Sequence, residues 1–247
     1  MLTVSPLPIT DRYTVSLAQH AGDLVAAQRL RYSVFNLELR EGLPGSVANG
    51  LDVDEFDDVC DHLIVRERET DSVVGTYRMQ TGETAVAHRG YYCDREFDLC
   101  PMESLRGSIL ELGRACIARE HRNQVVLGLL WKGIANHARR SGARYLIGCS
   151  SLSSQDESAG LALYRGLALR YLVTRAWRTR PKPGWTCTDD GVNRTAIALP
   201  RLMASYLALG ARICGEPAID REFRTIDFLT LLDLEEMPAR VVHKFLR

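Results

Sequence analysis

The chain has 247 residues, of which 46% are hydrophobic and 25% are charged, and its 31 basic and 31 acidic side chains give a formal net charge of zero. This composition is that of a globular protein with a substantial core, and the charge balance argues against binding to nucleic acid through overall charge. The N-terminus lacks the pattern of a secretory signal, and the longest apolar run, residues 125–131, is far below the roughly 20 residues of a spanning helix. We therefore expect a cytoplasmic protein, with peripheral contact to the inner membrane left open.

The pattern of apolar, turn and capping residues predicts an α/β protein with a mixed sheet. In chain order we first expect a helix over about 23–40, a Gly/Pro-rich and then acidic segment over 41–58, and a β-hairpin over 62–80 that turns at 70–72. After an irregular segment over 81–107, we expect a strand over about 108–118, a helix over about 124–140 and a short strand over 145–149. The remainder should form a helix over about 159–172, a basic segment over 175–185, a helix near 200–211 and a strand near 225–232. The whole chain, 1–247, is expected to form one domain, with a core over about 12–200 and a C-terminal helix–strand extension over about 200–247.

The seven cysteines are scattered along the chain without a C-x-x-C pair, at positions 60, 93, 100, 116, 149, 187 and 214. With no secretion signal, this pattern is typical of free and mostly buried thiols. The sequence contains no H-E-x-x-H, G-x-S-x-G or P-loop pattern. We therefore expect neither a metal site nor a bound cofactor, with a nucleophilic cysteine or a zinc site as the alternative.

The strand predicted at 108–118 carries two charges inside an apolar run, I109-L-E-L-G-R-A-C-I117. A buried carboxylate or guanidinium is rare unless it is paired, because its desolvation costs several kcal/mol. On a regular strand Glu111 and Arg114, three residues apart, would point to opposite faces and could not pair. The two charges therefore need an explanation beyond that of a regular core strand.

Further charged and aromatic residues complete a pattern that resembles a known family. R31-x-x-x-F35, D54-x-x-D57, Arg78, Phe97 and E111-x-x-R114 resemble the residues shared by the acyl-homoserine-lactone (autoinducer) synthases, which belong to the acetyltransferase-like GNAT superfamily. The closer resemblance is to the ornithine-lipid N-acyltransferases and their hemolysin-labelled bacterial relatives, through D54-E-F-D-D-V-C-D-H-L63, V73-V-G-T-Y-R78, E96-F-D98, E111-L-G-R-A-C116, L129-L-W-K-G-I134 and G148-C-S150. The autoinducer synthases carry a tryptophan a few residues after the position of Phe35, where this chain has N36-L-E-L-R-E-G42, and this difference weakens the lactone-synthase interpretation.

The resemblance implies a GNAT-like fold, with a twisted mixed sheet flanked by helices, and an N-acyltransferase without a metal or redox cofactor. It implies transfer of a long-chain, 3-hydroxylated acyl group from acyl carrier protein to the α-amine of an amino acid, with ornithine favoured, to give a lyso-aminolipid. Acyl-CoA is the other candidate donor. Two alternatives stay open: an acyl-homoserine-lactone synthase, and a non-catalytic module that binds acyl carrier protein or a membrane.

The resemblance also implies roles for individual residues. GNAT folds have a β-bulge in the strand equivalent to 108–118, and Gly113 is the expected bulge site, which would turn Glu111 and Arg114 toward one cleft and leave backbone N–H groups for a thioester oxygen. Glu111 would be the general base and Tyr164 the acid that protonates the leaving thiolate, while a structural ion network and a packed core tyrosine are the alternatives. The residues expected to form the substrate site are Arg31, Phe35, Asp54, Asp57, Arg78, Phe97, Gly113, Arg114 and Cys116.

The start of the helix at 124–140 is where acetyl-CoA-using GNATs present glycines to a pyrophosphate. Here the stretch is R122-N-Q-V-V-L127, with bulky residues at the glycine positions. We expect this segment to contact the single phosphate of a carrier-protein phosphopantetheine arm, with CoA binding as the alternative, through Arg122, Asn123, Gln124, Val125 and Val126.

Basic and aromatic residues follow on the next helix and the segment after it: Arg165, Arg170, Arg175, Arg178, Arg180 and Lys182, with Trp177 and Trp185. They could form a surface for an acidic carrier protein or for lipid headgroups, and an ordinary solvated basic face is the alternative.

Overall fold

The computed structural model describes residues 11–189, 191 and 198–237. Their helices are α1 (Ala21–Tyr32), α2 (Gly82–Ala87), α3 (Gln124–Ser141), α4 (Glu157–Tyr171) and α5 (Arg201–Ala208), and their strands are β1 (Tyr13–Leu17), β2 (Asp61–Glu67), β3 (Val73–Thr81), β4 (Phe97–Asp98), β5 (Ile109–Ile117), β6 (Tyr145–Leu152), β7 (Arg180–Pro181), β8 (Arg212–Ile213), β9 (Ala218–Asp220) and β10 (Thr225–Asp233). The shorter helical segments are the π-helical η1 (Ser33–Glu38) and the 3-10 turns η2 (Pro44–Val47), η3 (Tyr92–Arg95), η4 (Cys100–Ser108), η5 (Arg119–His121) and η6 (Arg175–Trp177).

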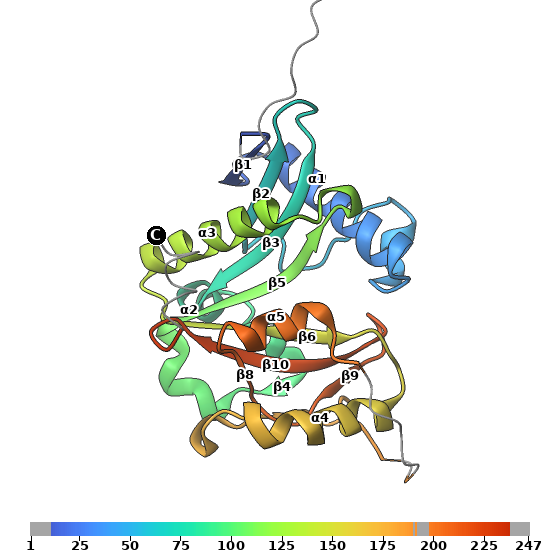
Figure 1. Ribbon diagram of the computed structural model, residues 1–247, viewed down its shortest axis with the longest axis vertical. Coiled ribbons are helices and arrows are strands. Elements are labelled where there is room, and N and C mark those ends of the chain that lie inside the picture. Colours follow the sequence, from blue (N-terminus) through green and yellow to red (C-terminus); the bar gives the residue numbers. More distant parts are fainter. Residues whose placement is uncertain (1–10, 190, 192–197, 238–247) are drawn as a thin grey trace, which may run out of the picture.

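The main sheet is mixed and has eight strands, with the order β1-β2-β3-β5-β6-β10-β8 and with β9 paired to β10 (Figure 1). The ladders are antiparallel except that between β5 and β6. A separate ladder joins β4 to β7. The mixed sheet with flanking helices confirms the α/β fold class expected from the sequence.

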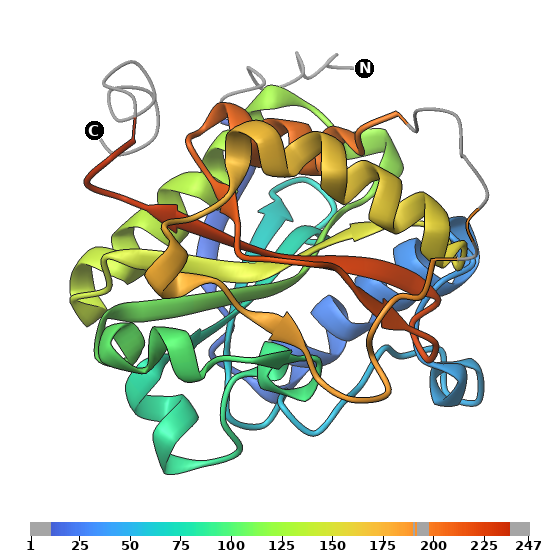
Figure 2. The same cartoon turned by 90° about the horizontal axis from the view of Figure 1, so that it is seen from below.

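Helices and loops cover the two faces of the sheet unequally. One face packs on α3 through the apolar side chains of Val126, Leu130 and Ile134, and on α4 and α5 farther along the sheet. The other face is covered by α1 and by the irregular segment 82–108. Figure 2 shows this layering, with α4 and α5 on one side of the sheet and the blue-green segments on the other. The site described below lies on the second face.

Local sequence explains why several of these elements begin and end as predicted. The β2–β3 hairpin turns at Asp71, which takes a φ of +55° that aspartate tolerates. Helix α3 begins at the side chain of Asn123, which accepts the backbone N–H groups of Val125 and Val126, and ends at Gly142 in the left-handed conformation. These short-range signals were sufficient to predict both elements.

The C-terminal segment expected as an extension contains a strand of the main sheet. β10 pairs with β6 from Ile226 opposite Leu152 to Asp233 opposite Tyr145. All of its residues are buried, because it lies inside the sheet with both faces covered. β1 and α2 were not predicted, since a five-residue strand and a six-residue helix carry little periodic signal.

Two expectations about the chain as a whole can be compared with the described residues. All seven cysteines lie among them and are free thiols, as expected. None of the described helices is long and apolar enough to cross a membrane.

Candidate functional site

A β-bulge interrupts the ladder between β3 and β5. Thr76 pairs with Cys116 and Arg78 pairs with Gly113, so that Tyr77 faces two residues of β5, Arg114 and Ala115. The bulge expected near Gly113 is therefore confirmed. However, the residue with the left-handed backbone is Arg114, with a φ of +48°. Gly113, the residue expected as the bulge site, is its neighbour.

The bulge brings the two charges of β5 to one face of the sheet. Glu111 is directly opposite Gln80, and Gly113 is opposite Arg78, so these positions share a face. The Glu111 carboxylate accepts the backbone N–H of Tyr92 at 2.7 Å and that of Cys93 at 2.8 Å. The guanidinium of Arg114 lies over the ring of the same Tyr92, 4.8 Å from its centroid. Both charges thus converge on one aromatic residue.

Three arginines and three aspartates on this face form a closed ring in which acids and bases alternate. Its order is Arg31, Asp52, Arg114, Asp54, Arg78, Asp57 and back to Arg31. The N–O contacts are 2.8 Å for Arg31–Asp52, 3.2 Å for Arg114–Asp52, 2.7 Å for Arg114–Asp54, 2.9 Å for Arg78–Asp57 and 2.6 Å for Arg31–Asp57, and Arg78 also pairs with Asp54. We call these six residues the Arg–Asp ring.

The Arg–Asp ring is buried but electrically balanced. No side chain in it is more than 7% exposed. Burial alone would raise the pKa of Asp57, but hydrogen bonds and charge from Arg31, with the charge of Arg78, lower it below its ordinary value. The contacts of Arg114 with the ring also explain how a non-glycine residue keeps the left-handed backbone, which costs about 1–2 kcal/mol.

Five members of the ring were expected from the sequence, and Asp52 was not. Arg31, Asp54, Asp57, Arg78 and Arg114 were all expected in one site, and the structure brings them together. Asp52 is fully buried and contacts two of the arginines. The signal that could have found it is the spacing D52-x-D54-x-x-D57 inside the acidic segment.

Apolar residues adjoin the ring on the side of α1. Phe35, Cys116, Leu30 and Val34 form one small core cluster, and the ring of Phe35 lies 5.4 Å from that of Phe223. Arg114 in turn lies over Phe223, 4.8 Å from its centroid. Phe35 and Cys116 therefore adjoin the charged residues, as expected.

Phe97 does not join this group. Its ring is fully buried in another cluster, with Tyr91, Cys93 and Leu99, on the strand β4 that pairs with β7. The β4–β7 ladder connects it to the segment after α4, a tertiary pairing that the local sequence does not reveal. Phe97 therefore lies in a different cluster from Phe35, and its role in the substrate site stays a prediction.

The bulged part of β5 faces open space although β5 is an interior strand. The parallel ladder with β6 runs from Ile109–Tyr145 to Glu111–Ile147, and the two strands then separate (Figure 1). Residues 112–115 on β5 and 148–149 on β6 are partly exposed. A Cβ added at Gly113 would meet no atom within 4 Å, so there is room on the face that carries Arg78 and Glu111.

Glu111 combines this location with an altered acidity. It is 5% exposed, and burial raises the pKa of its carboxyl above the ordinary value, although the hydrogen bonds from Cys93 and Tyr92 act in the opposite direction. Each of its oxygens accepts one backbone N–H, which leaves lone pairs for another donor. Such a carboxylate can accept a proton close to neutral pH more readily than an exposed glutamate.

The start of α3 is less open than a phosphate cradle would be. The backbone N–H groups of Val125 and Val126 both donate to Asn123 Oδ1 at 3.0 Å, and the side chain of Val126 is fully buried in the core. Arg122 forms a two-point ion pair with Glu38, at 2.6 and 2.7 Å. Arg122 and Gln124 are exposed and the side chain of Asn123 is half-buried.

Tyr164 lies apart from Glu111 in the fold. It is on α4, partly buried against the cluster that includes Leu152, Leu167 and Phe228. That cluster is on the face of the sheet opposite to Glu111. Within the part of the chain that the structure describes, Tyr164 and Glu111, expected as acid and base, share no hydrogen bond or ring contact.

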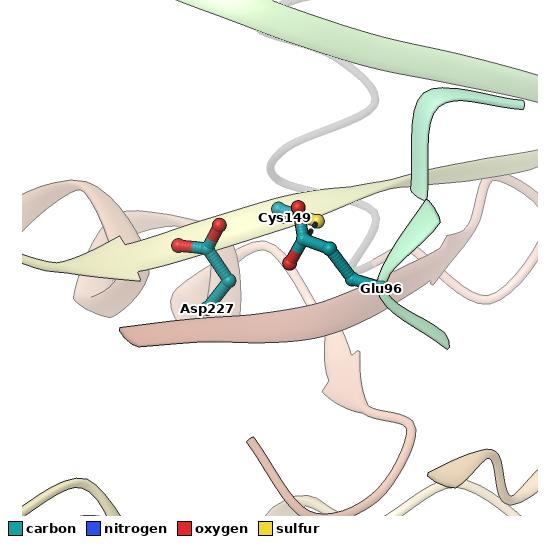
Figure 3. A group of neighbouring side chains, drawn as sticks. All are labelled: Glu96, Cys149 and Asp227. Atoms are coloured by element: carbon teal, nitrogen blue, oxygen red, sulfur yellow. Dashed lines mark hydrogen bonds between the residues drawn. The ribbon is translucent and has the colours of Figure 1, made fainter. Parts of the chain in front are cut away.

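A second group of acids lies on the same face as Glu111 and was not predicted. Glu96, Cys149 and Asp227 turn their side chains toward one another, with their oxygen and sulfur atoms within 4.8 Å (Figure 3). The thiol of Cys149 is 4.0 Å from Glu96 Oε2. This set of ligand atoms could hold a cation. Its first signal in the sequence is E96-F-D98, which was noted without a role for Glu96.

Comparisons with known proteins show the family to which the chain belongs. Residues 30–132 match the family described as Acetyltransferase (GNAT) domain. The chain is 32% identical to the L-ornithine N(alpha)-acyltransferase of Rhodobacter capsulatus, over 92% of each chain, and 32% identical to the protein of the same name from Agrobacterium fabrum, over 92% of this chain and 82% of the relative.

Solved structures show the same fold at low sequence identity. FeeM, an N-acyl amino acid synthase from uncultured soil microbes, superposes with a TM-score of 0.56 at 11% identity, over 91% of this chain and 92% of FeeM. The AHL synthase LasI superposes with a TM-score of 0.53 at 13% identity, over 94% of both chains. These similarities confirm the expected GNAT-like fold.

Proposed function

Because this chain belongs to the L-ornithine N(alpha)-acyltransferase family and is therefore an acyltransferase with a GNAT domain, we propose that it acylates the α-amine of L-ornithine. The acyl donor in this proposal is a long-chain, 3-hydroxylated acyl group on acyl carrier protein, and the product is a lyso-aminolipid. Acyl carrier protein and the free amino acid would be met in the cytoplasm, and the product would leave toward a membrane surface.

In the proposed reaction the neutral α-amine attacks the carbonyl carbon of the thioester. The C–N bond forms, the C–S bond then breaks, and the leaving thiolate takes up a proton. Glu111 accepts the proton that the amine loses, directly or through one water molecule. Its buried position and raised pKa support this role, because a base works best when its pKa is close to the pH of the reaction.

The bulge supplies the second part of the mechanism. One extra residue of β5 lies opposite Tyr77, so the backbone of Arg114 and Ala115 departs from the regular ladder. We assign the N–H groups of this pair to the thioester oxygen, where they would stabilise the negative charge that develops during attack. The Arg–Asp ring would hold the bulge in place through the guanidinium of Arg114.

The phosphopantetheine arm would pass the start of α3. Since Asn123 already satisfies the N–H groups of Val125 and Val126, the exposed Arg122 and Gln124 are better placed to meet a single phosphate. The role of Tyr164 as the acid for the thiolate stays a prediction. Its replacement by phenylalanine would show whether its hydroxyl matters.

The observation that carries the proposal is the buried Glu111 beside a half-exposed bulge, in a chain with ornithine acyltransferase relatives along most of its length. The test is to incubate purified protein with 3-hydroxyacyl carrier protein and a panel of amino acids, and to identify products by mass spectrometry. We expect N-acylornithine as the main product, and faster turnover with acyl carrier protein than with the matching acyl-CoA.

The same assay separates the alternatives. A lactone formed from S-adenosylmethionine, with no acylated amino acid, would identify an autoinducer synthase instead. Binding of acyl carrier protein without any turnover, unchanged in Glu111→Gln, would identify a non-catalytic module.

A further inference from the structure

Glu96 and Asp227 are buried carboxylates without a cationic partner among the described residues. They are 0% and 5% exposed, and a third acid, Asp220, is 3% exposed beside them. Among the residues that the structure describes, Glu96 Oε1 and Asp227 Oδ1 have no hydrogen-bond donor. None of the ion pairs within the described ranges includes any of these three acids. The contrast with the Arg–Asp ring is clear, because there every buried aspartate has two arginines.

Such an arrangement is costly without a ligand. A buried charge without a partner costs several kcal/mol, so a carboxyl in this position shifts its pKa and tends to be protonated. Burial, with the charge of Asp227, raises the pKa of Glu96 well above its ordinary value, and burial raises that of Asp227 to about 6. A cation placed between the two carboxylates would remove this cost.

The two acids lie beside the proposed acyl-transfer site. Glu111 pairs with Ile147 on β6, and Cys149 is two residues farther on the same face, a distance of roughly 7 Å along a strand. Cys149 pairs with Leu229 on β10, and Asp227 is two residues from Leu229, again on this face. The partly exposed Cys149 thus connects the open bulge of β5 with the two carboxylates.

The geometry points to a subsite in which Glu96 and Asp227 bind the side-chain ammonium of the amino-acid acceptor while its α-amine lies at Glu111. This inference rests on the proposed function and goes beyond it by assigning the residues that select a diamino acid. An extended ornithine separates its two nitrogens by about 6 Å, similar to the rise of two residues along β6 from Ile147, beside Glu111, to Cys149, beside Glu96. An ammonium offers three N–H donors. Two acceptor atoms that both lie at hydrogen-bond distance from its nitrogen are at most about 4.6 Å from each other.

A metal ion fits the same atoms less well. Burial and the charge of Glu96 raise the pKa of the Cys149 thiol well above its ordinary value, so a metal would have to displace a tightly held proton before the sulfur could bind it as thiolate. The nearby Lys182 is not the missing cation, since its ammonium donates to the carbonyl oxygen of Asp94. An acceptor ammonium is therefore the cation that both the chemistry and the location favour.

The test compares two acceptors that differ by one charged group. Ornithine and norvaline share the α-amino acid and the three-carbon chain, but norvaline has no terminal ammonium. For wild type, Glu96→Gln, Asp227→Asn and the double variant, kcat/KM is measured with both acceptors. We expect the ornithine/norvaline ratio to fall at least about tenfold in each single variant, as for loss of a charge-assisted hydrogen bond, with norvaline turnover retained. Asp98→Asn, an exposed acid two residues from Glu96, is the matched control and should leave the ratio unchanged.

A binding measurement decides the inference even without turnover. Ornithine, norvaline and zinc chloride are each added to wild type and to Glu96→Gln, and the melting temperature is recorded. We expect ornithine to raise it in wild type and not in the variant. If wild type acylates no amino acid, the proposed function fails, yet this binding result would still support the subsite. An unchanged ornithine/norvaline ratio, no effect of ornithine on wild type, or a rise with zinc alone would each overturn the subsite.

Discussion

Glu111 and Arg114, three residues apart on β5, act on the same residue: Glu111 accepts the backbone N–H of Tyr92 and Arg114 lies over its ring. On a regular strand they would face away from each other. The bulge opposite Tyr77 turns them to one face, where Glu111 stays close to the open space and Arg114 enters the Arg–Asp ring. One irregularity of the backbone therefore places the proposed proton acceptor and a structural anchor on the same face of the sheet.

Removal of the Glu111 carboxylate tests the proposed base. Glu111→Gln should lower kcat by about 10²–10⁴-fold, the range for loss of general-base catalysis. In wild type, kcat/KM should fall as the pH drops through the pKa of Glu111, which lies above the ordinary value for glutamate, and the variant should lose this acidic limb. Glu103→Gln, at an exposed position, is the control. A variant with the wild-type pH profile would speak against the assignment.

Disruption of the Arg–Asp ring should affect stability before chemistry. Asp52→Asn leaves two buried arginines short of a charge, and we expect the free energy of unfolding to fall by about 3–5 kcal/mol. The exposed pair Arg89–Glu55, with side chains 53% and 55% exposed, provides the matched control. There Glu55→Gln should change stability by less than about 1 kcal/mol. Equal effects in denaturant titrations of the two variants would show that the ring adds no special stability.

Two glycines near the bulge should respond in opposite ways to a larger side chain. Gly113 has open space around its Cβ direction, so Gly113→Val should keep the melting temperature but reduce acyl transfer at least about tenfold by filling the cleft. A Cβ at Gly148 would be 2.3 Å from the carbonyl oxygen of Leu112. Gly148→Ala should therefore destabilise the fold by about 1–3 kcal/mol. Full activity in Gly113→Val would place the substrate elsewhere.

The buried acids should make stability depend on pH between 5 and 7. The pKa of Asp227 is about 6 in the folded state, which is above its value in the unfolded chain. The folded state therefore binds more protons, and the stability that this group contributes is lost as the pH rises through about 6. The groups that face it are Glu96, Asp220 and Cys149, with Arg95 nearby.

Two histidines act in the opposite sense in this range, since burial lowers the pKa of the buried His62 and of the partly buried His137. The measurement is therefore the difference between wild type and Asp227→Asn. In the absence of acceptor, we expect the free energy of unfolding of the variant, taken relative to that of wild type, to increase by on the order of 2 kcal/mol as the pH rises from 5 to 7.5. A difference in the free energy of unfolding between the two proteins that stays constant across this pH range would contradict the prediction.

Carrier-protein docking can be tested on exposed arginines of α4 and of η6, the turn that follows it. Arg170 and Arg175 are exposed, and an acidic partner would gain from their charge. Arg170→Glu combined with Arg175→Glu should raise KM for acyl carrier protein about tenfold at low salt and leave KM for acyl-CoA unchanged. Arg140→Glu, at an exposed position on α3, is the control. An equal change for both donors would exclude this surface as the docking site.

Local patterns in the sequence determined the main elements, because their causes are local. The turn at Asp71, the cap at Asn123 and the stop at Gly142 each depend on residues within a few positions. The bulge near Gly113 and five members of the Arg–Asp ring followed from resemblance to a family, and the structure places the charges together.

Only the tertiary structure decided the rest, because those contacts join residues far apart in the chain. Asp52 contacts Arg114, which is 62 positions away in the chain, and the ladder with β7 holds Phe97 in a different cluster from the Arg–Asp ring. The Glu96–Asp227 pair exists because β10 returns into the sheet beside β6. Burial gives these acids their unusual pKa values, and burial is a property of the packed fold. The sequence by itself determined the residue types available for acyl transfer, while the fold decided which of them share a face and which charges are left without a partner.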